Sequence, residues 1–84
     1  MAKHGELLAR ILKGGSDANI AFEDLRLLLL HLGFDERIRG SHHIFRRSDV
    51  EDRINLQRDG KQAKPYQVRQ VRGVILRYRL GSEL

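Results

Sequence analysis

The sequence has 84 residues, of which 40% are hydrophobic and none is cysteine. This length suits a single domain, and the hydrophobic content is too high for a disordered tail. The lack of cysteine excludes disulfide bonds, thiolate catalysis and cysteine-ligated zinc. No segment approaches the roughly 20 apolar residues of a membrane span, and residues 1–13 lack the pattern of a signal peptide. We therefore expect a cytoplasmic protein with no membrane partner.

Positive charge is concentrated in the second part of the chain, and the net charge is +5. Residues 1–35 contain four Lys or Arg and five Asp or Glu, whereas residues 36–84 contain twelve and six. Ten of those twelve cations are arginines, which can bind a phosphate through two parallel hydrogen bonds. This distribution indicates a polyanionic partner or an acidic protein, but a well-solvated surface would explain it equally well.

The first part of the chain predicts two helices. Residues 6–13 have apolar side chains on one side, and Gly14-Gly15 should end this helix. Residues 22–32 carry leucines on more than one side, so the second helix should be buried between two neighbours. Gly33 should end it in the left-handed conformation, and Phe34 should supply the hydrophobic contact that accompanies such an end.

After residue 35 the hydrophobic pattern becomes that of strands. Strands are predicted at 36–39, 42–47 and 54–57, with 48–53 as a charged loop. A last helix should span 66–80, directly after Pro65. The expected fold class is α+β, in the order α-α-β-β-β-α, with a three-stranded antiparallel sheet packed against helices. The predicted core consists of Leu25, Leu28, Leu29, Leu32, Ile44 or Phe45, Leu56, Val71, Ile75 and Tyr78.

The segment Gly40-Ser41-His42-His43-Ile44-Phe45 is the best candidate for a functional site. Gly and Ser at a strand junction let the backbone turn and expose the first residues of the next strand. A histidine exposed there can titrate near neutral pH and act as a general acid or base. Adjacent strand residues point to opposite faces, so His42 and His43 cannot readily bind one metal ion. Such a pair can also be merely a polar stretch of the protein surface.

The run Leu32-Gly33-Phe34, a short arginine-bearing strand and residues 39–45 together resemble the core motif of HicA toxins, also called YcfA-like proteins. The resemblance covers about residues 20–80, so we expect one HicA-like domain over 1–84, with 1–19 as an N-terminal helical extension. It implies a fold similar to the double-stranded-RNA-binding domain, an mRNA interferase activity and neutralisation by a HicB antitoxin. It also implies that the histidine directly after Gly-Ser is catalytic.

That histidine is His42, and His43 is the alternative. The chain differs from many HicA sequences after the third strand begins, where they carry a Pro-x-His segment and this chain has Asn55-Leu56-Gln57. RNA supplies its own nucleophile, the 2′-hydroxyl, so one histidine with nearby cations can suffice without a metal or cofactor. The predicted RNA-binding residues are Arg39, Ser41, Arg46, Lys61 and Lys64.

These observations favour an endoribonuclease toxin that cleaves mRNA and is neutralised by a cognate antitoxin. One alternative is a non-catalytic RNA-binding module, in which the histidines play no chemical part. The other is a protein-interaction module whose arginines bind an acidic partner. Cleavage of RNA in the presence of EDTA would separate the first hypothesis from the other two.

Overall fold

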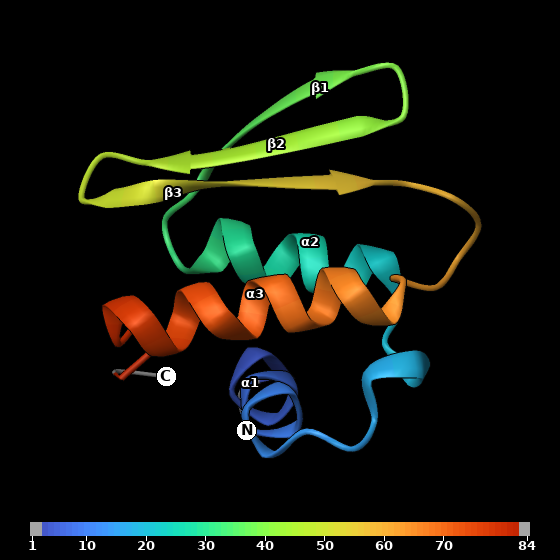
Figure 1. The fold of residues 1–84 in the computed structure, drawn as a ribbon, viewed down its shortest axis with the longest axis vertical. Coiled ribbons are helices and arrows are strands. Elements are labelled where there is room, and N and C mark those ends of the chain that lie inside the picture. The colour runs from blue at the N-terminus through green and yellow to red at the C-terminus, as the bar shows by residue number, and fades with distance from the viewer. Residues whose placement is uncertain (1–2, 83–84) are drawn as a thin grey trace.

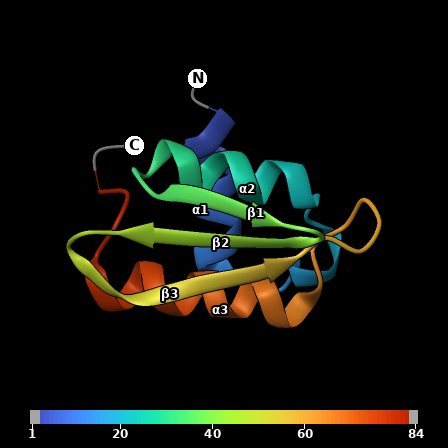
Figure 2. The same cartoon turned by 90° about the horizontal axis from the view of Figure 1, so that it is seen from above.

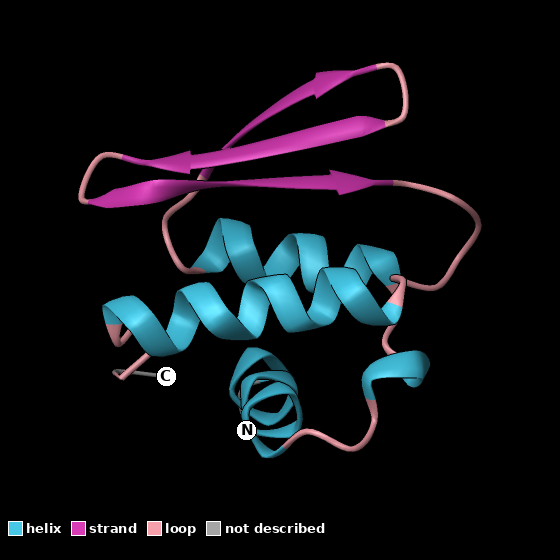
Figure 3. Ribbon diagram, in the orientation of Figure 1, coloured by secondary structure: helices cyan, strands magenta, loops and turns pink. Residues whose placement is uncertain are grey.

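The computed structural model describes residues 3–82. The elements are helix α1 (Lys3–Lys13), a 3-10 helix η1 (Asp17–Asn19), helix α2 (Phe22–His31), strands β1 (Asp35–Arg39), β2 (His42–Arg47) and β3 (Val50–Gln57), and helix α3 (Pro65–Tyr78) (Figure 3). The strands form one antiparallel sheet, so the predicted α+β class and the α-α-β-β-β-α order are confirmed. None of the helices described between residues 3 and 82 has the length and apolar character needed to cross a membrane.

The elements form three layers (Figure 1). The sheet is one outside layer, α2 and α3 lie beneath it, and α1 crosses them on the side away from the sheet. Seen from above, the sheet lies in front of all the helices (Figure 2). The sheet face that points away from the helices is called the outer face here. Strand alternation and exposure place on it Asp35, Arg37, Arg39, His42, Ile44, Arg46, Glu51, Arg53, Asn55 and Gln57.

A tight turn sets the register of the sheet. The two residues Gly40 and Ser41 join β1 to β2, so that Arg39 pairs directly with His42. Gly40 has a φ of 58°, which glycine adopts without steric cost. Positive φ at only the first of two turn residues is the geometry of a type II′ turn, whose twist suits an antiparallel hairpin. The turn therefore decides which β2 side chains reach the outer face.

Strand β3 begins earlier than predicted. The interpretation of 48–53 as a loop is wrong beyond Ser48 and Asp49, because pairing with β2 already begins at Val50. The side chain of Val50 is buried, whereas Glu51 and Arg53 are exposed on the outer face. The other elements lie close to their predicted positions.

The core lies between the sheet and the helices, largely as predicted. Leu29 is one of its fully buried members, and the predicted residues Leu25, Leu28, Leu32, Leu56, Val71 and Ile75 are also buried. Phe45 is fully buried and Ile44 only half-buried, which settles the choice between them. The prediction for Tyr78 is wrong in degree. As the last residue of α3, it packs against the margin of the core and stays half-exposed.

Helix α1 is joined to this core rather than separate from it. Leu7, Leu8 and Ile11 belong to the same buried cluster as the residues of α2 and α3. In addition, the Arg72 guanidinium of α3 donates a 2.7 Å hydrogen bond to the Ile11 carbonyl and forms an ion pair with Asp17. The second helix therefore lies between α1 and the sheet, as its leucine pattern predicted.

Candidate functional site

The two histidines of the motif lie on opposite faces of β2. His42 is exposed on the outer face, as the first residue of the strand. His43 points toward the helices and is only 5% exposed. Side chains alternate between the faces of a strand, so only one of two adjacent residues can contact a molecule bound to one face. A molecule on the outer face would therefore meet His42.

Polar side chains from both neighbouring strands flank His42. Its cross-strand partners are Arg39 of β1 and Gln57 of β3, and the Cβ atoms of such partners are about 5 Å apart. Ser41 precedes His42 in the turn, and its carbonyl accepts a 2.8 Å hydrogen bond from the backbone N–H of Arg58. Three residues of the predicted site, His42, Arg39 and Ser41, thus lie together at one end of the sheet.

His43 takes part in a buried ionic cluster. Its Nδ1 donates a 2.7 Å hydrogen bond to Oε2 of Glu36, and Nε of Arg26 donates a second 2.7 Å bond to the same oxygen. Burial raises the pKa of the Glu36 carboxyl, but the hydrogen bonds from Arg26 and His43 outweigh burial and hold that pKa below its ordinary value. The Phe22 ring packs edge-on against the imidazole. This cluster fastens β1 and β2 to α2 and so holds the strand that carries His42.

We expect Glu36→Gln to lower the free energy of unfolding by about 1–3 kcal/mol at neutral pH, because Arg26 would lose its ionic partner in a largely buried place. The folded-state pKa of Glu36 is lowered, so its stabilising contribution is fully present above the unfolded-state value, about 4.3. It is lost as the pH falls through the folded-state pKa. The difference in the free energy of unfolding between the variant and the wild type should therefore become smaller at acidic pH.

Urea denaturation near neutral pH and near pH 3 measures this difference. The control is Glu51→Gln, because Glu51 is exposed and no ion pair joins it to another residue described between 3 and 82. A deficit of equal size at both pH values would contradict the assignment of Glu36 as a stabilising anion.

The loop between β3 and α3 lies at the same end of the sheet as His42 (Figures 1 and 2). Lys61 is exposed there, and its carbonyl accepts a 2.8 Å hydrogen bond from the N–H of Phe22. Lys64 forms a 2.9 Å ion pair with Asp59, and this contact raises the pKa of the lysine. Both lysines of the predicted site are thus near this end of the sheet, in a loop that the backbone fastens to the start of α2.

A buried glutamine supports the same end of the sheet. The side chain of Gln67 in α3 is fully buried. Its amide nitrogen donates a 3.0 Å hydrogen bond to the Gln57 carbonyl, and its amide oxygen accepts a 3.1 Å bond from the N–H of Lys64. Gln67 therefore holds the end of β3, beside His42, against the first turn of α3.

Among the residues that the structure describes, most arginines away from the outer face have a carboxylate partner, although some, such as Arg69 and Arg79, do not, whereas the arginines on the outer face all lack one. The arginines that bond to carboxylates are Arg26, Arg47, Arg58, Arg72 and Arg77. Within residues 3–82, no ion pair or hydrogen bond joins the side chains of the four outer-face arginines to another residue: Arg37, Arg39, Arg46 and Arg53. Like charges gathered on one face repel each other. The outer face is therefore open to an anion.

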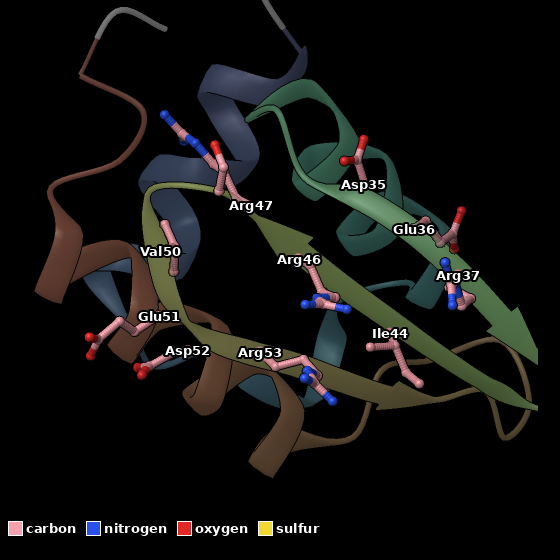
Figure 4. A pocket seen from close by; sticks show the side chains of 11 residues that line it. Asp35, Glu36, Arg37, Ile44, Arg46, Arg47, Val50, Glu51, Asp52 and Arg53 are labelled. Carbon is pink, nitrogen blue, oxygen red and sulfur yellow. The ribbon is translucent and has the colours of Figure 1, made fainter.

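Arg46 lies away from His42 along this face. It is four residues further along β2, a separation of about 13 Å. There it lines a hollow of about 620 Å³, together with Arg37 of β1 and Arg53 of β3 (Figure 4). Of the predicted RNA-binding residues, Arg39 and Ser41 thus lie beside His42, Lys61 and Lys64 lie in the loop at the same end of the sheet, and Arg46 lies at this hollow.

Several residues of this region escape prediction from the sequence. Arg37 stands two positions before Arg39 in a predicted strand, so the period of two could have placed it on the same face. Arg53 could not be placed, because its segment was interpreted as a loop. The partners that support the histidine pair, Arg26, Glu36 and Gln67, lie far apart in sequence or look like ordinary surface residues, and no local pattern indicates them.

Within residues 3–82, no three His, Cys, Asp or Glu side chains gather in a way that could hold a metal ion. Neither the comparison with curated proteins nor that with solved structures finds a match. The comparison with protein families matches residues 22–77 to the model described as HicA toxin of bacterial toxin-antitoxin. This match runs from the first residue of α2 almost to the end of α3 and includes the whole sheet. It covers well over half of the chain and contains the Gly-Ser-His-His motif, so the protein belongs to the HicA family of toxins of bacterial toxin-antitoxin systems.

Proposed function

We propose that this protein is an endoribonuclease that cleaves mRNA, with His42 as the group that transfers a proton in the reaction. The observation that carries the proposal is the composition of the outer face, which combines the exposed His42 with four arginines that lack a partner within residues 3–82. A phosphate between Arg39 and His42 would have its charge stabilised by the guanidinium group. Destruction of mRNA would also explain how a toxin of this family stops growth.

The chemistry needs few groups because RNA supplies its own nucleophile. His42 takes the proton from the 2′-hydroxyl or gives one to the leaving 5′ oxygen. The 2′ oxygen forms a bond to phosphorus while the bond from phosphorus to the 5′ oxygen breaks. One fragment then ends in a 2′,3′-cyclic phosphate and the other begins with a 5′-hydroxyl. These steps require neither a metal ion nor a cofactor.

The remaining site residues would bind the substrate. Ser41 and Gln57 stand beside His42 and can donate hydrogen bonds to phosphate or ribose oxygens. Lys61 and Lys64 would contact phosphates near the same end of the sheet, and Arg46 would contact one further along. Each such contact releases counterions from the RNA, so binding should weaken steeply with salt.

An antitoxin partner follows from family membership, and we propose that it resembles HicB and neutralises the toxin in the cytoplasm by covering the outer face. An acidic surface on the antitoxin would complement the arginines and exclude RNA from them. The same arginines would serve a module that only binds RNA or only binds protein, and the test of activity separates these functions.

The purified protein should cleave a single-stranded RNA equally well with and without EDTA, and the fragments should end in 2′,3′-cyclic phosphate. A deoxyribose at the cleaved position should block the reaction, because it lacks the 2′-hydroxyl. Intact RNA that nevertheless binds with a steep salt dependence would show a non-catalytic binding module. The absence of both cleavage and binding would favour the protein-interaction module.

A further inference from the structure

The hollow on the outer face is separate from the surroundings of His42. Its arginines come from three strands: Arg37 from β1, Arg46 from β2 and Arg53 from β3. Figure 4 shows Arg46 and Arg53 on adjacent strands, with Arg37 on the far side of Ile44. Carboxylates also line this hollow, namely Asp35, Glu36, Glu51 and Asp52. Glu36 pairs with Arg26 and Asp52 with Arg77, and within residues 3–82 no ion pair joins any of these carboxylates to the three arginines.

Stability does not account for this arrangement. Arg46 and Arg53 carry like charges on adjacent strands, which destabilises a sheet, and no ion pair joins Arg46 to Asp35, its cross-strand partner on β1. Arginine side chains also lose considerable conformational freedom when they are held in place. An anion bound among the three guanidinium groups would offset their mutual repulsion and their lost conformational freedom, because charge-assisted hydrogen bonds to phosphate are among the strongest that proteins form.

We propose that the hollow formed by Arg37, Arg46 and Arg53 is a second phosphate site, which binds the backbone of single-stranded RNA at a distance from the cleaved bond. This inference rests on the proposed function, since it makes His42 the reacting end of a longer substrate track. The track follows β2 from His42 past Ile44 to Arg46, a separation of four residues or about 13 Å.

The charge pattern along the outer face favours a single strand over a duplex. Glu51 lies two residues before Arg53, toward the β2–β3 turn, and Asp35 stands directly opposite Arg46 on β1, so acidic side chains border the positive part of the face at this end. Recognition of double-stranded RNA extends over about 16 base pairs and depends on the shape of the duplex. A strip this short suits a few nucleotides of single strand. Half-buried Ile44 offers an apolar surface for a base between the two phosphate sites.

The test measures binding of a mixed-sequence single-stranded RNA of about ten nucleotides. The RNA carries 2′-O-methyl groups, which prevent cleavage. The variant is Arg46→Gln combined with Arg53→Gln. The matched control is Arg69→Gln combined with Arg79→Gln, which removes the same charge from exposed arginines on and after α3. We expect the first pair to weaken binding at least about tenfold. The slope of log K against log salt should fall by about 0.7 for each phosphate that the variant no longer neutralises.

Two further measurements locate the effect. The Arg46→Gln and Arg53→Gln variant should raise the KM for cleavage of a long RNA far more than it lowers kcat, because the hollow binds the substrate away from the cleaved bond. His42→Ala should bind the longer RNA as the wild type does. Equal weakening by the two arginine pairs would overturn the proposal, because general charge would then explain binding. It would also be overturned if the first pair weakened the affinity only for an antitoxin and not for RNA.

Failure of the second site is distinguishable from failure of the proposed function. If the protein binds RNA through the hollow and never cleaves it, the nuclease activity is refuted and the second phosphate site stands. If it cleaves long RNA with a KM that Arg46→Gln and Arg53→Gln leave unchanged, the second site is refuted and the nuclease stands.

Discussion

Replacing His42 with alanine should reduce RNA cleavage about 10²- to 10⁴-fold, the range by which general acid-base groups accelerate reactions. The same change should relieve the growth inhibition that overexpression of the wild type causes. The imidazole of His42 is exposed on the outer face and contributes no surface to the core, so thermal unfolding should be nearly unchanged. Single-turnover cleavage of a labelled RNA, with unfolding measured on the same preparation, checks both expectations.

His43 provides the control for this experiment, but alanine is the wrong replacement there. His43→Ala would leave Glu36 without one of its hydrogen bonds and open space beside Phe22, so loss of activity could reflect unfolding. His43→Asn keeps a donor in nearly the same position and should retain cleavage per folded molecule. If that variant folds without cleaving RNA while His42→Ala remains active, the catalytic role belongs to His43 and our residue assignment is wrong.

Replacing Leu29 with alanine should lower the free energy of unfolding by about 2–5 kcal/mol. The side chain of Leu29 has no exposed surface, and the helix on which it lies is enclosed by α1 and the sheet. The loss is a large share of the roughly 5–15 kcal/mol that holds a small domain folded. Urea denaturation of the purified variant gives the value.

Leu27→Ala is the matched control, because Leu27 lies on the same helix but is 36% exposed. This change removes the same atoms from a place where water already reaches them, so its effect should be several times smaller. Equal losses for the two variants would mean that burial does not set the contribution of the leucines in α2.

The sequence predicted the fold where one physical signal dominated. The leucines of α2 repeat with the helical period, Gly33 takes the expected positive φ of 95°, and Phe34 is buried behind it. The start of β3 was not predictable in the same way. Charged Glu51, Asp52 and Arg53 hide the alternation that Val50 begins, and only pairing with β2 makes this segment a strand. Long-range pairing has no local signature.

The candidate site was predictable only in part, because it also depends on long-range pairing. The motif itself placed His42 and His43 on opposite faces, but nothing in it indicated which face the helices would cover. The helices cover the face of β2 that carries Phe45, whose side chain is buried in the core. His43 lies two residues before Phe45 on the same strand and therefore on the same face. The grouping of Arg46 with Arg37 and Arg53 required the register of three strands, which no single segment contains.

The two-residue turn at Gly40 and Ser41 fixes which side chains of β2 face the helices and which face outward. One residue more or fewer in that turn would shift β2 against β1 and exchange its two sides. His42 would then be driven into the apolar interior and His43 out toward solvent, while Phe45 would leave the core. A single-residue insertion in this turn would therefore change more than a surface loop, because it would displace both the proposed catalytic residue and the packing of the core.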